Sequence, residues 1–136
     1  MKTVFADSSY FLALVSVRDE DHVQATEFSK SSDHSIVTTA WVLVEVANGL
    51  ASSTRRHLAV ELIESLVQDE NVEIVAPNQN IFAEGFNLYS ERGDKDWSLT
   101  DCISFVVMKQ QGLTEALTGD HHFEQAGFRA LLLQQD

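Results

Sequence analysis

Short apolar segments alternate with longer segments of helical character along the chain, and this alternation most constrains the fold. The apolar segments stop at turn residues or at a proline, as β-strands do. They cover residues 3–6, 35–38, 72–76, 115–118 and 128–133. Strands that alternate with helices predict a parallel sheet joined by right-handed crossovers. The expected fold is therefore α/β, a three-layer α/β/α arrangement with a central parallel sheet of four to five strands.

Helical patterns fill the segments between the expected strands. They cover residues 10–17, 19–29, 40–50, 57–68, 81–90 and 98–110, and one more short turn of helix follows Asp120. The second helix is expected to open with Asp19, Glu20 and Asp21, because a helix dipole favours acids in a first turn. Thr38 or Thr39 is expected to cap the third helix.

The composition is that of an ordinary globular protein. Of its 136 residues, 44% are hydrophobic and 22% are charged, which argues against disorder and against a membrane protein. We expect a single domain over residues 1–136. Asp7 interrupts the apolar run near the N-terminus, so this run is not expected to be a signal peptide. The single cysteine, Cys102, fits a reducing compartment, and a cytoplasmic location is expected.

Four carboxylates stand alone within segments that otherwise have the pattern of a core. Asp7 follows the first strand, Glu45 lies inside the third helix, Asp101 lies at the start of the sixth helix, and Asp120 follows the fourth strand. In an open parallel sheet the carboxyl ends of the strands share one edge, where such folds bind ligands. Crossover helices begin at that same edge, so we expect the four carboxylates to share one cleft.

A cluster of four ionised carboxylates needs a neutralising charge. At about 5 Å each pair repels by roughly 3 kcal/mol at an effective dielectric constant near 20, or about 20 kcal/mol for all pairs. A whole domain is stable by only about 5–15 kcal/mol. Hard divalent cations with oxygen ligands, Mg²⁺ or Mn²⁺, are the natural candidates, whereas an all-carboxylate site argues against zinc. Such cations suit the hydrolysis of phosphate esters.

Asp101 has two possible roles. The spacing Ser98-x-x-Asp101 fits a capping box, in which the acid accepts the amide of the residue that caps the helix. The same position also points the carboxylate to the edge where Asp7 lies. A carboxylate turned back to the Ser98 amide is a cap, and one directed to Asp7 is a ligand.

These motifs resemble those of the PIN-domain ribonucleases, which include the VapC-type toxins of toxin–antitoxin pairs. The resemblance rests on Asp7-Ser8-Ser9, Thr39-x5-Glu45, Ser98-Leu-Thr-Asp101 and Thr118-x-Asp120-x-x-Phe123, in order along nearly the whole chain. It implies a Mg²⁺-dependent endoribonuclease that hydrolyses RNA with a metal-activated water. It also implies a homodimer and a small antitoxin partner. Asp7, Glu45, Asp101 and Asp120 correspond to the family's acidic quartet, with Asp7 and Asp101 as the principal metal ligands.

Four further residues have both a functional and an ordinary interpretation. The hydroxyls of Ser9 and Thr118 are expected to orient the carboxylates, although each is also an ordinary residue for a helix cap or a strand end. Arg55 and Arg56 belong to the densest basic patch. They are possible contacts for RNA phosphates, or a solvated start of a helix.

Some features depart from the expected pattern or leave alternatives open. The net charge of −12 is unlike the basic face usual in RNA-binding proteins. Asp96 is expected to be a solvated loop acid, with a contact to metal or substrate as the alternative. His121 and His122 are expected to form a polar turn, with general acid–base chemistry as the alternative. An α/β metal-dependent phosphatase and a catalytically silent PIN-fold binding module stay open as functions. Asp7-Ser8-Ser9 lacks the second acid of the aspartyl-phosphate phosphatases, and the full quartet argues against a silent module.

Overall fold

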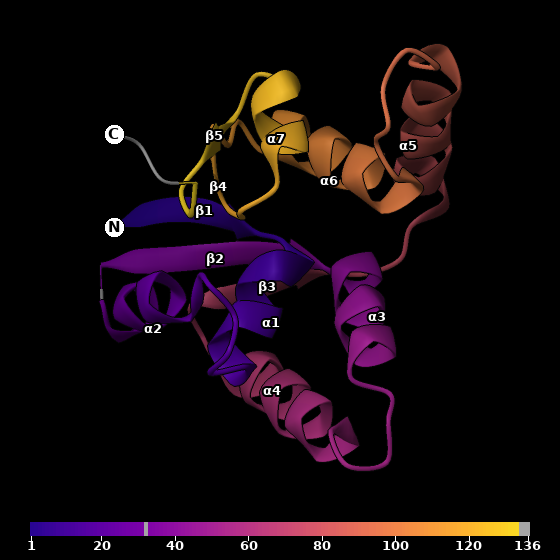
Figure 1. Ribbon diagram of the computed structural model, residues 1–136. Coiled ribbons are helices and arrows are strands. Elements are labelled where there is room, and N and C mark those ends of the chain that lie inside the picture. Colours follow the sequence, from indigo (N-terminus) through magenta and orange to yellow (C-terminus); the bar gives the residue numbers. More distant parts are fainter. Residues whose placement is uncertain (32, 134–136) are drawn as a thin grey trace.

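Five parallel strands form one central sheet (Figure 1). The computed structural model describes residues 1–31 and 33–133. The strands are β1 (Lys2–Ala6), β2 (His34–Thr39), β3 (Val72–Val75), β4 (Glu115–Leu117) and β5 (Arg129–Ala130). They lie in the order β3-β2-β1-β4-β5, and each neighbouring pair is parallel. The predicted α/β fold with a parallel sheet of four to five strands is confirmed.

The strand β1 lies at the centre of the sheet, where the direction of the chain across the sheet reverses. β2 and β3 extend to one side of β1, and β4 and β5 extend to the other. The register pairs Ala6 with Leu117, and the Asp7 amide donates to the Leu117 carbonyl at 3.1 Å. The residues that follow β1 and β4 are therefore neighbours at the carboxyl edge. A reversal of this kind is the usual ligand site of an open α/β sheet.

Helices cover both faces of the sheet, which gives the predicted three layers. They are α1 (Ser8–Val15), α2 (His22–Lys30), α3 (Ala40–Gly49), α4 (Arg56–Gln68), α5 (Gln79–Glu91), α6 (Leu99–Gln110) and α7 (His121–Gln125). In Figure 1, α1, α2 and α4 lie below the sheet, whereas α6 and α7 lie above it. Within the described residues, no helix has both the length and the apolar character that crossing a membrane requires.

Two of the predicted boundaries are wrong. The second helix begins at His22 rather than at Asp19, because Asp19 Oδ1 accepts the Asp21 amide at 2.9 Å, and such a bond favours a turn over a helix. The last strand comprises only Arg129–Ala130 instead of residues 128–133. Its one neighbour, β4, has only three residues, and the chain then leaves the ladder, with the Leu132 amide donating to the Thr118 carbonyl.

Aromatic packing fixes α6 against α7. The Phe105 ring contacts Trp97 and Phe123, with ring centroids 5.1 Å and 4.9 Å apart. All three side chains are buried, and edge-to-face pairs of this kind stabilise a core beyond the area that they bury. The packing therefore holds the N-terminal ends of these two helices, which carry Asp101 and Asp120, at a fixed separation.

The helix α5 packs closely on α6 and leaves an apolar outer face. A Cβ atom at Gly85 would lie 2.5 Å from Ile103 Cγ1 and 3.1 Å from Ile103 Cα, so the close approach needs a glycine. On the outer face, Phe82, Phe86 and Tyr89 are 43%, 51% and 48% exposed. Their spacing places them along one side of the helix.

Candidate active site

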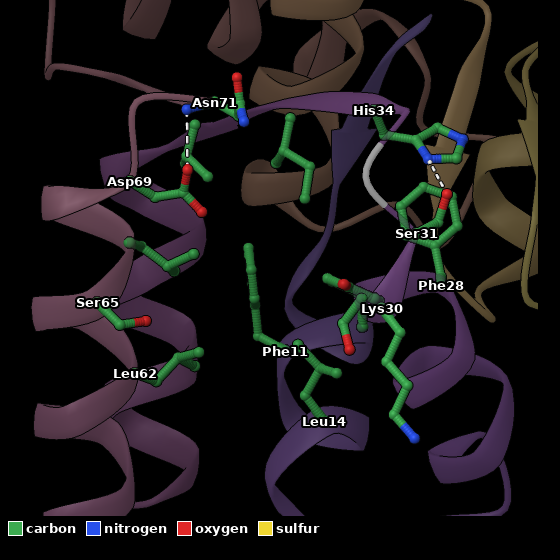
Figure 2. A pocket seen from close by; sticks show the side chains of 15 residues that line it. Phe11, Leu14, Phe28, Lys30, Ser31, His34, Leu62, Ser65, Asp69 and Asn71 are labelled. Carbon is green, nitrogen blue, oxygen red and sulfur yellow. Dashed lines mark hydrogen bonds between the residues drawn. The ribbon is translucent and has the colours of Figure 1, made fainter. Parts of the chain in front are cut away.

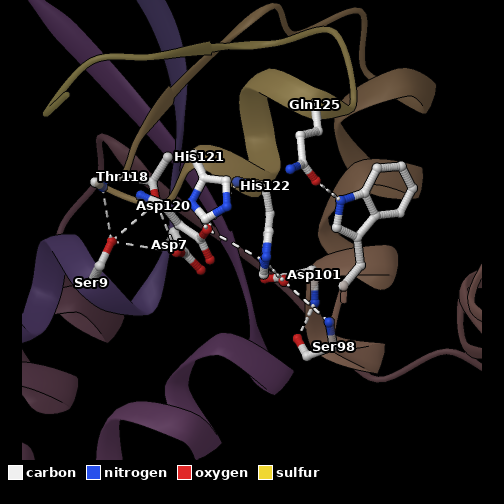
Figure 3. Close-up of polar contacts among 11 residues, drawn as sticks. Asp7, Ser9, Ser98, Asp101, Thr118, Asp120, His121, His122 and Gln125 are labelled. Atoms are coloured by element: carbon white, nitrogen blue, oxygen red, sulfur yellow. Dashed lines mark hydrogen bonds and ion pairs between the residues drawn. The ribbon is translucent and has the colours of Figure 1, made fainter. Parts of the chain in front are cut away.

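Asp7 is a buried carboxylate at the carboxyl end of β1. Its side chain is nearly inaccessible, with 4% of the residue exposed. Thr118 Oγ1 donates to Asp7 Oδ2 at 2.9 Å, as Figure 3 shows. Burial raises the pKa of Asp7 to about 6, against the hydrogen bond from Thr118, and the charges of Asp101 and Glu45 raise it further. Both of these acids therefore lie close enough to Asp7 for their charges to act on it.

The hydroxyls of Ser9 and Thr118 connect the ends of β1 and β4. Ser9 Oγ lies 3.0 Å from Thr118 Oγ1 and 3.4 Å from Asp7 Oδ2. The Gly119 amide donates to Ser9 Oγ at 3.2 Å, and the Asp120 amide donates to Thr118 Oγ1 at 3.0 Å. The structure thus places both hydroxyls against the Asp7 carboxylate. It also links Asp7 to the backbone of Asp120 through Thr118.

Asp101 has the geometry of a helix cap. The Ser98 amide donates to Asp101 Oδ2 at 3.2 Å, and the Asp101 amide donates to Ser98 Oγ at 3.0 Å, which forms the capping box. Burial raises the pKa of Asp101, the bond from the Ser98 amide opposes this, and the charge of Asp120 raises it further. Of the two roles considered from the sequence, the structure shows the cap. A carboxylate has two oxygens and about four lone-pair sites, so a ligand role for Asp101 stays a prediction.

Asp120 and His122 lie beside Asp101. Asp120 is the residue before α7, and its Oδ1 accepts the His122 amide at 2.9 Å. His122 Nδ1 lies 3.1 Å from Asp101 Oδ2 and 3.3 Å from Asp120 Oδ1. The sequence places His122 in a polar turn, and the structure shows in addition that only 19% of its side chain is exposed. The spacing Asp120-x-His122 at the start of a short helix is the sequence signal that could have indicated a histidine near the acids.

Glu45 occupies the second turn of α3 and is half-buried. Its charge raises the pKa of Asp7, so Glu45 lies near Asp7. Over residues 1–31 and 33–133, the ligand atoms of Asp120, His121 and His122 form a group of at least three within 4.8 Å of one another, and Asp7, Glu45 and Asp101 stand outside that group. The four acids are thus linked as neighbouring charges, and only Asp120 of the four belongs to the group with ligand spacing.

Three further residues considered from the sequence are exposed. Arg55 and Arg56 are exposed and follow the C-terminal end of α3, whereas the site lies towards its N-terminal end. Arg56 Nη2 donates to the Ala51 carbonyl at 2.7 Å. Asp96 is exposed in the loop before α6. A contact of these side chains with RNA or metal stays a prediction.

A pocket at the opposite edge of the sheet has a different character. Figure 2 shows this cavity of about 370 Å³, which lies between α1, α2 and α4 and includes Phe11, Phe28 and Leu62. His34 and Val72, which also line it, begin β2 and β3, so the pocket lies at the amino edge. The four acids are not among its lining residues. This cavity is therefore separate from the candidate active site.

The donor set at the carboxyl edge fits a divalent cation. Carboxylates that lie close together and are shielded from water raise one another's pKa, and a cation removes this penalty by neutralising them. Asp7 and Asp101 both show raised pKa values with burial as the first cause. The oxygen donors suit Mg²⁺ and Mn²⁺.

A sequence profile of the PIN domain matches residues 4–129. The chain belongs to the PIN-domain family. This match confirms the resemblance seen in the four acidic motifs and covers every residue of the predicted quartet. Membership in the family places the four acids in a PIN domain, and their individual roles stay predictions.

Several known proteins resemble this PIN domain. The 23S rRNA-specific endonuclease VapC20 of Mycobacterium tuberculosis is 24% identical over 125 residues, which cover 92% of this chain and 95% of that protein. The crystal structure of VapC20, a sarcin–ricin loop cleaving toxin, matches with a TM-score of 0.82 at 23% identity and covers 92% and 95% of the two chains.

Two solved VapBC assemblies share the fold at lower identity. VapBC2 from Rickettsia felis, bound to a DNA fragment from their promoter, gives a TM-score of 0.67 at 11% identity, with 94% and 96% of the chains covered. VapBC-1 from nontypeable Haemophilus influenzae gives 0.64 at 14% identity, with the same coverage.

Proposed function

We propose that this PIN domain is a metal-dependent endoribonuclease and the toxin of a toxin–antitoxin pair. The observation that carries the proposal is the raised pKa of Asp7, a buried acid at the carboxyl edge. Burial raises this pKa to about 6, and the charges of Asp101 and Glu45 contribute to the increase. A folded protein retains such a destabilising arrangement where function requires it. The similarity to VapC20 supports RNA as the substrate.

The four acids would bind the cation, and the hydroxyls of neighbouring residues would orient these acids. Asp7 and Asp101 are the proposed principal ligands, and Glu45 and Asp120 complete the site directly or through water. A bound Mg²⁺ or Mn²⁺ supplies Lewis acidity and a more acidic water for in-line hydrolysis of a phosphodiester. Thr118 fixes the rotamer of Asp7 through its hydrogen bond at 2.9 Å. The Ser98 capping bonds fix Asp101 in the same way.

The acidity of the chain shapes how RNA would be bound. With a net charge of −12, the domain lacks the counter-charge for broad electrostatic capture of RNA. We therefore propose a narrow range of substrates, with structured ribosomal RNA as the first candidate because VapC20 is a 23S rRNA-specific endonuclease. Arg55 and Arg56 are proposed contacts for an RNA strand that extends beyond the site, because both are exposed.

Two protein partners belong to this proposal. The likeness to the VapBC assemblies supports a small antitoxin that binds the domain. A homodimer is the second, because the apolar outer face of α5 with Phe82, Phe86 and Tyr89 is exposed. Analytical ultracentrifugation of the purified chain decides the oligomeric state. A cytoplasmic location is part of the same proposal.

The phosphatase and the silent binding module are weaker alternatives. Aspartyl-phosphate phosphatases use a second acid two residues after the first, and here that position is Ser9, whose hydroxyl contacts Thr118 at 3.0 Å. A silent module would not need to keep a buried acid beside like charges, since replacing it would relieve their repulsion.

Cleavage of RNA by the metal-loaded protein tests the proposed function. The wild type is incubated with 23S rRNA and with bulk RNA in Mg²⁺ or Mn²⁺, and a small phosphomonoester serves as a parallel substrate. We expect RNA cleavage that stops with excess EDTA. Asp7→Asn is expected to reduce cleavage more than about 100-fold, since even outer residues of metal sites typically contribute 10–100-fold.

Asp33→Asn is the matched control, because Asp33 is exposed and precedes β2 at the opposite edge of the sheet. It is expected to cleave RNA like the wild type. Cleavage that persists in excess EDTA or in Asp7→Asn would overturn the proposal. Hydrolysis of the phosphomonoester without cleavage of RNA would favour the phosphatase.

A further inference from the structure

His122 is placed between two acids that come from different elements. Its ring nitrogen Nδ1 lies 3.1 Å from Asp101 Oδ2 and 3.3 Å from Asp120 Oδ1. Asp101 belongs to the first turn of α6, whereas Asp120 follows β4. Figure 3 shows the imidazole directed from α7 towards the Asp101 carboxylate. This nitrogen therefore contacts two of the four acids, Asp101 and Asp120.

The local structure fixes this ring in place. The His122 amide bonds to Asp120 Oδ1 at 2.9 Å, which sets the first turn of α7. The next residue, Phe123, is fully buried against Phe105, with ring centroids 4.9 Å apart. Because the turn is capped and the next residue is buried, the His122 side chain has little freedom to leave the site.

The neighbouring histidine provides an internal comparison. The His121 side chain is 68% exposed, and its Nδ1 lies 3.9 Å from Asp120 Oδ1. The His122 side chain is only 19% exposed. Two adjacent residues of the same chemistry thus differ in burial and in reach, and only His122 approaches both acids.

The spacing of the donor atoms matches that around a cation. His121 and His122 both belong to the group around Asp120, and His122 Nδ1 is the nitrogen that also approaches Asp101. For ligands at about 2.0–2.2 Å from an ion, neighbouring donors are about 3–4 Å apart. The separations of 3.1 Å and 3.3 Å between His122 Nδ1 and the two acids fall in that range.

We propose that His122 is a metal ligand and that it makes the site selective for a transition metal such as Mn²⁺ over Mg²⁺. The inference rests on the proposed metal-dependent function and adds a nitrogen donor to its four carboxylates. Mg²⁺ takes oxygen donors and water, whereas imidazole suits the later divalent metals. The donor set of one imidazole and several carboxylates is therefore the chemical basis of the selectivity.

Electron spin-echo spectroscopy of the Mn²⁺-loaded full chain tests this ligand. The chain is freed of metal with a chelator, dialysed and loaded with Mn²⁺ below one equivalent. We expect nitrogen modulation in the wild type that changes to the ¹⁵N pattern when histidine is labelled. It should disappear in His122→Gln and remain in His121→Gln, the matched control. His122→Gln should also lower the affinity for Mn²⁺ by at least about tenfold, with little change for Mg²⁺.

The outcomes separate this inference from the proposed function. Binding of Mn²⁺ without nitrogen modulation, or modulation that survives in His122→Gln, overturns the role of His122 and leaves a carboxylate site. A wild type that binds neither Mn²⁺ nor Mg²⁺ overturns both proposals. Labelled histidine in the wild type decides whether a histidine nitrogen is bound at all, and the two variants then decide which histidine supplies it.

Discussion

The two halves of the candidate active site are held in different ways. The strand side consists of Asp7, Ser9 and Thr118, where hydroxyls link the ends of adjacent strands and Asp7 is 4% exposed. The helix side consists of Asp101, Asp120 and His122, where helix caps and an imidazole hold the acids. Asp101 is buried there as well, whereas the Asp120 side chain is 30% exposed, so this side is open to water at Asp120.

This difference indicates a division of roles between the two sides. On the strand side, burial raises the pKa of Asp7 to about 6 and neutral hydroxyls are its partners, so its geometry is fixed at a cost in stability. On the helix side, His122 contacts both acids and supplies a donor of another chemistry. Under the proposals made above, the strand side would set the position of a cation, and the helix side would set which cation is preferred.

The largest expected effect is a pH dependence of stability that comes from Asp7. Its ordinary pKa is 3.8, and in the folded chain it is about 6. Between these values the folded chain keeps a proton that the unfolded chain has released. Stability in the absence of metal therefore falls as pH rises from about 4 to about 6, and it stays lower above that range. The loss is about 3 kcal/mol.

Denaturant unfolding in EDTA at several pH values measures this loss. Asp7→Asn cannot ionise, so it should lack this part of the slope and exceed the wild type in stability near pH 7. Asp33→Asn, altered at an exposed residue, should follow the wild type. Equal slopes in Asp7→Asn and the wild type would show that Asp7 is not a destabilising acid. Divalent metal should restore stability to the wild type, because it binds the folded chain.

A smaller effect is expected from Thr118→Val, which keeps the shape of the side chain and removes its hydroxyl. Asp7 loses the hydrogen bond that lowers its pKa, so this pKa should rise further. RNA cleavage is expected to fall about 10–100-fold, as for other residues that orient metal ligands. The pKa of Asp7 is measured by NMR titration of its carboxyl carbon, and cleavage is measured in parallel.

Thr114→Val is the control for this change, because Thr114 is exposed just before β4. It should leave both the pKa of Asp7 and the cleavage rate unaltered. A Thr118→Val protein with an unchanged pKa at Asp7 would contradict the role of the hydroxyl on the strand side.

The smallest effect is expected from Ser98→Ala on the helix side. This change removes the oxygen that accepts the Asp101 amide at 3.0 Å. Loss of such a cap destabilises a protein by about 1 kcal/mol, which chemical denaturation measures. If Asp101 is also a ligand, the affinity for Mn²⁺ should fall as well. An unaltered affinity for Mn²⁺ would show that the cap does not position Asp101 for metal.

The fold and the position of the acids could be read from the sequence because they depend on local patterns. Strand ends and helix starts are marked by Asp7, Asp120 and Ser98, and parallel topology then brings them to one edge. The capping box was also visible in the spacing Ser98-x-x-Asp101. Predicting these features requires only the order of the strands and helices and not the packing between them.

The placement of His122 between Asp101 and Asp120 could not be predicted from the sequence, because it depends on tertiary packing. The helix α7 has five residues, too few for a periodic pattern that separates a buried side from an exposed one. The contact between Phe123 and Phe105 sets its rotation, and thereby decides which of the two histidines turns inward. The predicted last strand is too long for a related reason, since the length of β5 depends on the three residues of β4 with which it pairs.

An anomalous difference map from crystals of the full chain soaked in Mn²⁺ tests the central claim most directly. The account predicts one strong peak at the carboxyl edge of the sheet, within roughly 2.0–2.6 Å of carboxylate oxygens of Asp7 and Asp101. A peak far from Asp7, or no peak in crystals that withstand the soak, would contradict a metal-dependent site built on the four acids.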